Sequence, residues 1–277
     1  MTAPVHLAFI GFGEVSKLFA RQFLAAGAAS VSAYDILFDR ADVAAAKRAE
    51  AEAIGVRAAT DAADAARTAD IVFSAVTADA VATVAREARL YARNGQMFID
   101  VNSASPETKR AAAAELTAAG AAYVEAAVMA PVAPRGLATP ILAGGPQAQA
   151  AADRLNPLGM AIKPVAVEYG RASATKLSRS IMIKGIEALI CDSARAARAW
   201  GVADDVFASL NDTFPGTDFA KLADLMAARV RQHGVRRAAE MREAADMLAE
   251  LGVDAGLARA VADAQERGAA VNADKGK

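Results

Sequence analysis

Two glycines near the N-terminus follow a short apolar run and precede a segment with helical apolar spacing. A strand that turns sharply into a helix leaves unpaired backbone N–H groups at the positive end of the helix dipole, a point that suits a pyrophosphate. Gly11 would allow the tight turn, and Gly13 would let a phosphate approach the backbone. The alternative is an ordinary helix-opening turn. The pattern favours a phosphate-binding turn formed by Gly11, Phe12, Gly13, Glu14 and Val15.

An acidic residue follows the next apolar run at the spacing of a dinucleotide site. Asp35 ends residues 31–35 and lies about 20 residues after Gly13. A carboxylate at this place accepts hydrogen bonds from the ribose 2′-hydroxyl of NAD and repels the 2′-phosphate of NADP. We therefore expect NAD as the cofactor. NADP stays possible, because Arg40 could reach a 2′-phosphate.

A long segment in the second half of the chain carries one polar stripe on an otherwise apolar helix. Residues 172–200 have apolar side chains over much of the helical circumference, which is typical of a buried helix. At 100° per residue, four polar side chains fall within about 80° of one another. They are Lys176, Ser180, Lys184 and Glu187.

A lysine that faces a dinucleotide cleft could act as a general acid or base, because burial and cationic neighbours lower the pKa of a lysine. The alternative is that Lys184 pairs with Glu187 and both reach solvent, while Lys176 extends its charged end to the surface. Spacing alone does not decide between the two.

Two segments at strand ends could also contact ligands. Asn102 and Ser103 follow a buried strand, although taken alone they fit a turn before a capped helix. Residues 125–132, which include Met129, run from a strand into small residues and prolines. Small residues there could let a substrate lie close to a nicotinamide, or could form only a tight connection.

A histidine–glycine pair stands between two helical patterns near the C-terminus. His233 and Gly234 would separate the helices, and Arg236 and Glu240 have the i, i+4 spacing of a surface ion pair. The second interpretation is that His233 and Arg236 reach the cleft and hold a carboxylate.

The elements that would position these residues alternate between strands and helices up to Tyr169. The expected strands are 5–10, 31–34, 56–58, 70–76, 96–100, 122–128, 140–143 and 162–167. Helices are expected at about 40–54 and 79–91, and a further one after Ser105 as N-cap and Pro106. The end of strand 70–76 would present Ala75, Val76 and Thr77 at the sheet edge where ligands bind.

This alternation predicts an α/β domain, residues 1–169, with a doubly wound and mostly parallel sheet of the Rossmann type. Residues 170–277 predict an all-α domain, joined to the first by the long interdomain helix. Its other helices are expected at 203–210, 218–232, 235–251 and 254–268. Because the long helix is apolar nearly all round, we expect it to pack against a second subunit in a homodimer.

Composition excludes several classes of function. The formal net charge is -1, so we expect neither a nucleic-acid partner nor an anionic membrane partner. No run of 18 or more apolar residues lacks charge, and the N-terminus does not resemble a secretion signal, so we expect a cytoplasmic protein. With one cysteine, Cys191, no thiolate metal cluster can form; we expect no metal, and Cys191 as a small core residue.

The order of these motifs resembles the β-hydroxyacid dehydrogenase superfamily, which includes 3-hydroxyisobutyrate and 6-phosphogluconate dehydrogenases, over essentially the whole chain. Residues 11–16 resemble its glycine motif, and residues 100–106 its post-strand loop with a Ser or Thr and a Pro. Residues 125–128 resemble its substrate motif, followed here by Met129 and an alanine in place of Ser-Gly. Residues 170–176 resemble the motif that supplies the catalytic lysine.

The resemblance implies an NAD(P)-dependent oxidoreductase that transfers a hydride between the cofactor and a β-hydroxy acid or related alcohol. Lys176 would be its general acid/base. Ala75, Val76, Thr77 and Asn102 would join the glycine turn and Asp35 in binding the cofactor. The implied substrate contacts are Ser103, Met129, Ser180, Lys184, His233 and Arg236.

Departures from the main pattern resemble a divergent phosphogluconate-dehydrogenase-like branch. Ser180 stands where Asn is usual, and the His233 segment stands where a Lys-Asp motif would be. The alternatives are an imine reductase, although related enzymes of that kind usually lack the lysine, and a dinucleotide-binding sensor without turnover.

Overall fold

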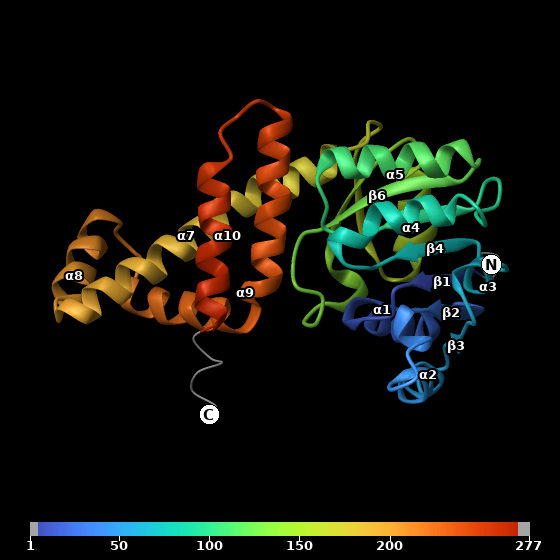
Figure 1. The fold of residues 1–277 in the computed structure, drawn as a ribbon, viewed down its shortest axis with the longest axis horizontal. Coiled ribbons are helices and arrows are strands. Elements are labelled where there is room, and N and C mark those ends of the chain that lie inside the picture. Colours follow the sequence, from blue (N-terminus) through green and yellow to red (C-terminus); the bar gives the residue numbers. More distant parts are fainter. Residues whose placement is uncertain (1–4, 271–277) are drawn as a thin grey trace. The chain divides into compact units, whose positions relative to one another are not determined.

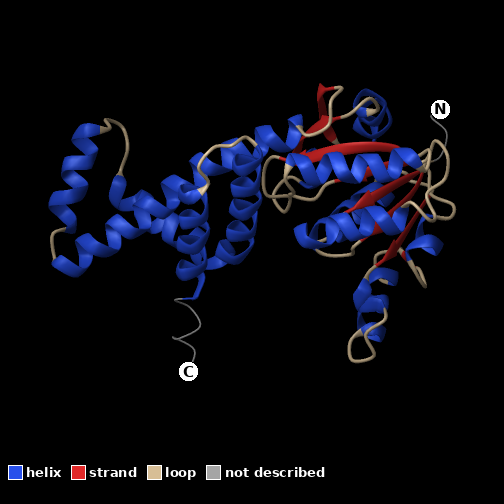
Figure 2. Cartoon of the chain, turned by 45° about the horizontal axis from the view of Figure 1, so that its top comes forward, coloured by secondary structure: helices blue, strands red, loops and turns tan. Residues whose placement is uncertain are grey.

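The computed structural model describes residues 5–270. The chain divides between Lys176 and Leu177 into two compact units, which we describe separately. Within the described residues, the strands belong to the first unit, and the second unit is built from helices (Figures 1 and 2).

The first unit contains an eight-stranded sheet in the order β3-β2-β1-β4-β5-β6-β7-β8. Neighbouring strands are parallel except β6 and β7, which run antiparallel. This confirms the doubly wound, mostly parallel sheet. The strand order reverses between β1 and β4, where the chain returns from one edge to start the other half; ligands bind at such a point. The strands are β1 His6–Ile10, β2 Ser30–Tyr34, β3 Arg57–Ala58, β4 Ile71–Ser74, β5 Met97–Asp100, β6 Ala122–Val128, β7 Pro140–Gly144 and β8 Ala161–Ala166.

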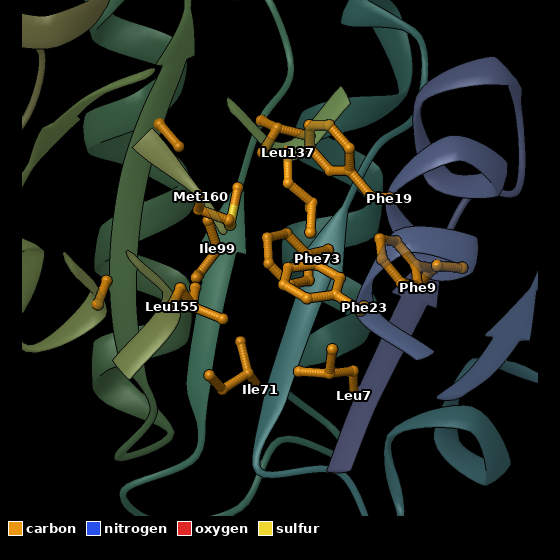
Figure 3. Packing of buried hydrophobic residues seen from close by; sticks show 14 of the residues in the cluster. Leu7, Phe9, Phe19, Phe23, Ile71, Phe73, Ile99, Leu137, Leu155 and Met160 are labelled. Carbon is orange, nitrogen blue, oxygen red and sulfur yellow. The ribbon is translucent and has the colours of Figure 1, made fainter. Parts of the chain in front are cut away.

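Helices cover both faces of this sheet because successive strand residues point to opposite sides. On one face, Phe9 and Phe73 stack with ring centroids 5.1 Å apart, and Phe23 of helix α1 lies 5.7 Å from Phe73 (Figure 3). The other face packs Phe98 and Tyr123 against α3, α4 and α5. The helices are α1 Glu14–Ala25, α2 Ala44–Glu52, α3 Ala62–Ala66, α4 Val81–Ala88, α5 Pro106–Ala118 and α6 Ala148–Leu155, with the 3₁₀ turns η1 Ile36–Phe38, η2 Ala78–Ala80, η3 Gly136–Ala138 and η4 Asn156–Leu158.

Two helices are shorter than the sequence pattern indicates. The helix expected from residue 40 begins at Ala44, because the Arg40 carbonyl accepts the N–H groups of Val43 and Ala44 in a preceding turn. The helix expected from residue 79 opens with the 3₁₀ turn η2 and becomes α-helical at Val81. The helix after Ser105 forms as predicted, since the Ser105 hydroxyl accepts the Thr108 N–H at 3.2 Å.

The second unit contains the long helix α7, which starts in the first unit, and three further helices. They are α7 Arg171–Trp200, α8 Ala203–Thr213, α9 Phe219–Glu250 and α10 Gly256–Ala270. The predicted break at His233 and Gly234 is wrong, because α9 runs through both. A Cβ on Gly234 would lie 2.3 Å from the Gln265 carbonyl oxygen of α10. This glycine therefore permits close helix packing and ends no helix.

Helix α7 has an unexpected distribution of side chains. Three residues of its predicted polar stripe are buried in the second unit: Ser180 is 3% exposed, Lys184 is 8% exposed and Glu187 is fully buried. Several apolar residues are exposed instead, with Met182 at 63% and Leu189 at 70%. These apolar side chains are not covered within the single chain, so the expected packing of this helix against a second subunit stays a prediction. Cys191, expected in the core, is only half-buried.

Across residues 5–270, no helix combines the length and the low charge that crossing a bilayer requires.

Candidate active site

The loop between β1 and α1 adopts the predicted sharp turn. Gly11 has a φ of +85°, and a Cβ at this position would lie 2.3 Å from the Ala75 carbonyl oxygen, so another residue would clash. The Ser16 hydroxyl, in the first turn of α1, donates to the Gly11 carbonyl at 2.7 Å and holds the turn against the helix.

Gly13 provides the open side of this turn. It is the N-cap of α1, no side chain caps the helix there, and nothing lies within 4 Å of where its Cβ would be. Glu14 and Val15 form the first turn of α1. A helix N-terminus with open space beside a glycine can receive a phosphate, so the residues present fit the pyrophosphate of a dinucleotide.

Asp35, directly after β2, lies against the same turn. One carboxylate oxygen accepts the Phe12 N–H at 2.6 Å, and the other accepts the Leu37 N–H at 2.9 Å. A carboxylate offers about four lone-pair directions, so both oxygens can still accept ribose hydroxyls. Asp35 thus occupies the position of the acid that follows the second strand in dinucleotide-binding folds.

Arg40, the residue that could serve a 2′-phosphate, is engaged elsewhere. Its Nε donates to one oxygen of Asp42 at 3.1 Å and its Nη2 to the other at 2.5 Å. This two-point pair uses the planar donor edge with which arginine would hold a phosphate.

Asn102 ties together the loops that follow β4 and β5. Its Oδ1 accepts the Val76 N–H at 2.6 Å, and its Nδ2 donates to Asp100 at 2.7 Å and to the Ser74 hydroxyl at 3.0 Å. Ala75 follows β4 and donates its N–H to the Ile10 carbonyl at 2.8 Å, so it joins the β1 end. These contacts place the segment from Ala75 to Thr77 beside the glycine turn, at the C-terminal edge of the sheet.

A buried polar cluster stands behind Asn102, and the sequence analysis missed it. Lys109 is fully buried in α5, and its Nζ lies 2.8 Å from one Asp100 oxygen, while the Tyr123 hydroxyl donates to the other at 2.8 Å. Burial, and next the charge of Asp100, raise the pKa of Tyr123 well above its ordinary value. The only sequence signal was a lysine within an alanine-rich helix.

Ser103 is placed beyond this cluster, in the loop after β5. Its hydroxyl oxygen is buried and has no hydrogen-bond partner among the residues that the structure describes. A buried hydroxyl without a partner is uncommon and suggests that a bound molecule supplies the contact. Met129, predicted to lie near the substrate, follows β6 directly and donates its N–H to the Pro140 carbonyl at 2.9 Å.

Helix α7 is capped by a carboxylate from the sheet. Glu125 of β6 is fully buried, and its oxygens accept the N–H groups of Gly170 and Ser173, each at 2.5 Å. A Cβ on Gly144 would lie 2.8 Å from this carboxylate, so glycine leaves the room it needs. Lys176 is half-buried and follows Ser173 by about one helical turn, so this cap fixes the segment that carries it.

In the second unit, Ser180 and Lys184 meet a residue that the sequence analysis had assigned to the surface. The Ser180 hydroxyl donates to Glu240 at 2.5 Å, and Lys184 Nζ lies 3.1 Å from both the Ser180 hydroxyl oxygen and Glu240. Burial lowers the pKa of Lys184, and the charge of Glu240 opposes that shift. Glu240 is thus part of the buried polar group.

The alternative that Lys184 pairs with Glu187 at the surface is wrong. Glu187 is fully buried and forms an ion pair with Arg237 of α9, and Arg229 Nη1 lies 3.8 Å from its other oxygen. Arg237, next to the predicted Arg236, therefore holds the buried carboxylate. Arg236 is exposed and His233 half-buried on α9, and Ser180 and Lys184 both contact Glu240 of the same helix.

Comparison with known proteins agrees with this geometry. Residues 6–163 match the model of the NAD binding domain of 6-phosphogluconate dehydrogenase, and residues 197–268 match a domain of unknown function (DUF1932). A conserved hypothetical protein from Sinorhizobium meliloti is 38% identical, with 100% of this chain and 92% of that chain covered and a TM-score of 0.82.

Two further solved structures are similar. The conserved protein MTH1747, of unknown function and described as similar to 3-hydroxyacid dehydrogenases, is 30% identical; coverage is 97% of this chain and 98% of that one, with a TM-score of 0.76. The 3-hydroxyisobutyrate dehydrogenase of Mycobacterium tuberculosis shares the fold, at 21% identity, 98% and 96% coverage and a TM-score of 0.77. The chain belongs to the family defined by the NAD binding domain of 6-phosphogluconate dehydrogenase.

Proposed function

We propose that this protein is an NAD-preferring oxidoreductase that interconverts a β-hydroxy acid, or a related alcohol, with its carbonyl compound. The observation that carries the proposal is the turn before α1. Gly13 leaves open space at the helix N-terminus, and Asp35 is held against the same turn by the Phe12 N–H at 2.6 Å. These are the two contacts that an NAD pyrophosphate and ribose require.

The preference for NAD rests on charge at the ribose end. Asp35 would repel a 2′-phosphate, and Arg40 is already held at two points by Asp42. Binding NADP would require breaking that ion pair and placing a phosphate near a carboxylate. The loops that hold Ala75, Val76, Thr77 and Ser103 lie at the same sheet edge and would line the nicotinamide half.

A bound nicotinamide supplies the acceptor or donor of the hydride. Lys176 takes the proton of the substrate hydroxyl during oxidation and returns a proton to the carbonyl oxygen during reduction. Ser103 donates or accepts a hydrogen bond to the substrate, which would satisfy its otherwise unpartnered hydroxyl. Met129 would contact the substrate from the same unit, and the substrate contacts expected from Ser180, Lys184, His233 and Arg236 stay predictions.

A substrate screen tests the proposal directly. The protein is incubated with NAD or NADP and a plate of β-hydroxy acids, polyol acids and aryl hydroxy acids, and the reduced cofactor is followed by absorbance. We expect turnover with at least one hydroxy acid and NAD, and loss of that turnover in Lys176→Ala while NADH still binds.

Lys163→Ala provides the matched control, because Lys163 is an exposed lysine of β8. Equal turnover in Lys176→Ala and Lys163→Ala would refute the role of Lys176. Tight NADH binding with no reaction on any plate would instead support imine reduction or a sensor without turnover.

A further inference from the structure

The second unit contains a cavity, open to solvent, that none of the predicted site residues lines. It measures about 240 Å³ and lies among α7, α9 and α10. Its apolar walls are built from side chains too short to fill the space, so a small molecule can occupy it. The small wall residues are Ala188, Ala194, Ala223, Ala227, Ala264 and Gly268.

Helices α9 and α10 cannot close this cavity by moving together. A Cβ on Gly234 would lie 2.3 Å from the Gln265 carbonyl oxygen, and a Cβ on Gly268 would lie 2.3 Å from Val230 Cγ1. The two helices are thus already at the closest approach that glycine allows, and close-packed helices transmit strain rather than collapse. The cavity is a fixed feature of this helix pair.

A buried acceptor lines the cavity and lacks a partner. Gln265 is fully buried, and its Nε2 donates to the Lys184 carbonyl at 3.2 Å. Its Oε1 has no hydrogen-bond partner within residues 5–270. An unsatisfied buried carbonyl oxygen destabilises the fold, so a donor on a bound molecule would be favoured here.

The rim of the cavity carries excess positive charge. Asp192 is shared between Arg195 at 3.2 Å and Arg267 at 3.8 Å, so one carboxylate serves two guanidinium groups. Arg231 also lines the cavity and forms no ion pair in the described part of the chain. A planar guanidinium at such a rim is suited to a carboxylate.

We infer that this cavity is a second binding site, for a small hydroxycarboxylate. The ligand hydroxyl donates to Gln265 Oε1, its carboxylate meets Arg231 and Arg195, and its short carbon chain lies against the alanine walls. The inference does not depend on the proposed reaction, because no residue placed in that reaction lines the cavity.

Cys191 gives a direct readout, because it lines the cavity and is the one cysteine of the chain. Its rate of modification by a chromogenic disulfide is measured at mildly alkaline pH, since burial raises the pKa of this thiol. A ligand that fills the cavity protects the thiol. At about ten times the dissociation constant, the unoccupied fraction is about one eleventh, so the rate should fall about tenfold.

Three probes separate the two recognition elements. They are 3-hydroxybutyrate, butyrate without the hydroxyl, and 1,3-butanediol without the carboxylate. We expect protection by 3-hydroxybutyrate at lower concentration than by either of the other two. In Gln265→Leu, 3-hydroxybutyrate and butyrate should protect alike, and in Arg231→Gln the advantage over 1,3-butanediol should shrink.

Controls make the result decisive. Lys221→Gln, an exposed change on α9 outside the cavity, and Lys176→Ala should both keep normal protection. If Gln265→Leu fails to fold, the exposed Arg231→Gln still tests the site. Equal protection by all three probes, or no protection, would overturn the inference. A modification rate that falls with protein concentration in the absence of probe would also overturn it, by assigning the cavity to a contact between two copies.

Discussion

Glu125 accepts the backbone N–H of Ser173 at 2.5 Å and thereby joins the middle of the sheet to the first turn of α7. A carboxylate at a helix N-terminus stabilises the helix dipole and satisfies N–H groups that otherwise lack partners. The lysine proposed for catalysis follows on the next turn. The position of Lys176 is therefore set by a fully buried side chain of the sheet.

Removing that charge should destabilise the protein. We expect Glu125→Gln to lower the free energy of unfolding by about 1–3 kcal/mol, because buried hydrogen bonds to a charged group are strong and one acceptor becomes a donor. Urea denaturation measures the change. Glu168→Gln, an exposed change nearby in sequence, should stay within about 0.5 kcal/mol. Equal stability of the two variants would contradict the cap.

Cofactor preference should follow two aspartates. Asp35→Ser removes the ribose acceptor, so we expect kcat/KM for NAD to fall about tenfold to 100-fold. Asp42→Asn releases Arg40 and should improve the use of NADP without reducing that of NAD. Steady-state kinetics with both cofactors tests this. If the double variant Asp35→Ser with Asp42→Asn keeps the ratio of kcat/KM for NAD to kcat/KM for NADP, neither Asp35 nor Arg40 reaches the ribose.

The buried pair of Lys109 and Asp100 should be costly to break. Lys109→Met leaves the Asp100 charge without its lysine, and we expect a loss of about 3–5 kcal/mol in the free energy of unfolding. The double variant with Asp100→Asn should recover part of that loss. Lys163→Met, at the exposed lysine, is the control for the substitution itself. A loss below about 1 kcal/mol in Lys109→Met would argue against the buried pair.

Lys184 predicts a pH dependence of stability. Its pKa is lowered in the folded protein from the ordinary value of 10.5, so between the lowered and the ordinary value the unfolded chain binds more protons. The free energy of unfolding therefore rises with pH across that window. Below the window, Lys184 is charged in both states, and burying that charge destabilises the folded protein to the full extent. Lys184→Gln should remove this rise. Urea denaturation of the unmodified protein and of Lys184→Gln at about pH 8 and about pH 10 measures the difference. The same change of unfolding free energy with pH in both proteins would contradict the prediction.

The exposed apolar residues of α7 predict a homodimer. Met182 and Leu189 are exposed in the single chain, and large exposed apolar patches mark contact surfaces. We expect light scattering to give twice the chain mass, and Met182→Glu with Leu189→Glu to give the monomer mass. Lys163→Glu, an exposed change in the first unit, should leave the mass unchanged. A monomer mass for the unmodified protein at all concentrations would reject the dimer.

Sequence patterns were sufficient for the turn at Gly11 and for the acid at Asp35, because the turn shows in neighbouring residues and the acid lies at a characteristic spacing from it. The continuity of α9 was not predictable in this way. Gly234 fits a helix end as well as a close packing contact, and the choice is made by Gln265 of another helix. The same holds for Glu240, whose spacing to Arg236 indicates a surface pair, while its partners lie on α7.

The buried polar side of α7 also bears on calorimetry. Exposure of apolar surface on unfolding raises the heat capacity, and exposure of polar surface lowers it. Both units bury polar residues, but the first unit exposes two aromatic-rich clusters when it unfolds, whereas the buried apolar residues of the second unit are mostly alanines with little area each. Per residue, the helical unit therefore has the smaller heat-capacity change and the flatter dependence of stability on temperature, so cooling weakens the nucleotide-binding unit more.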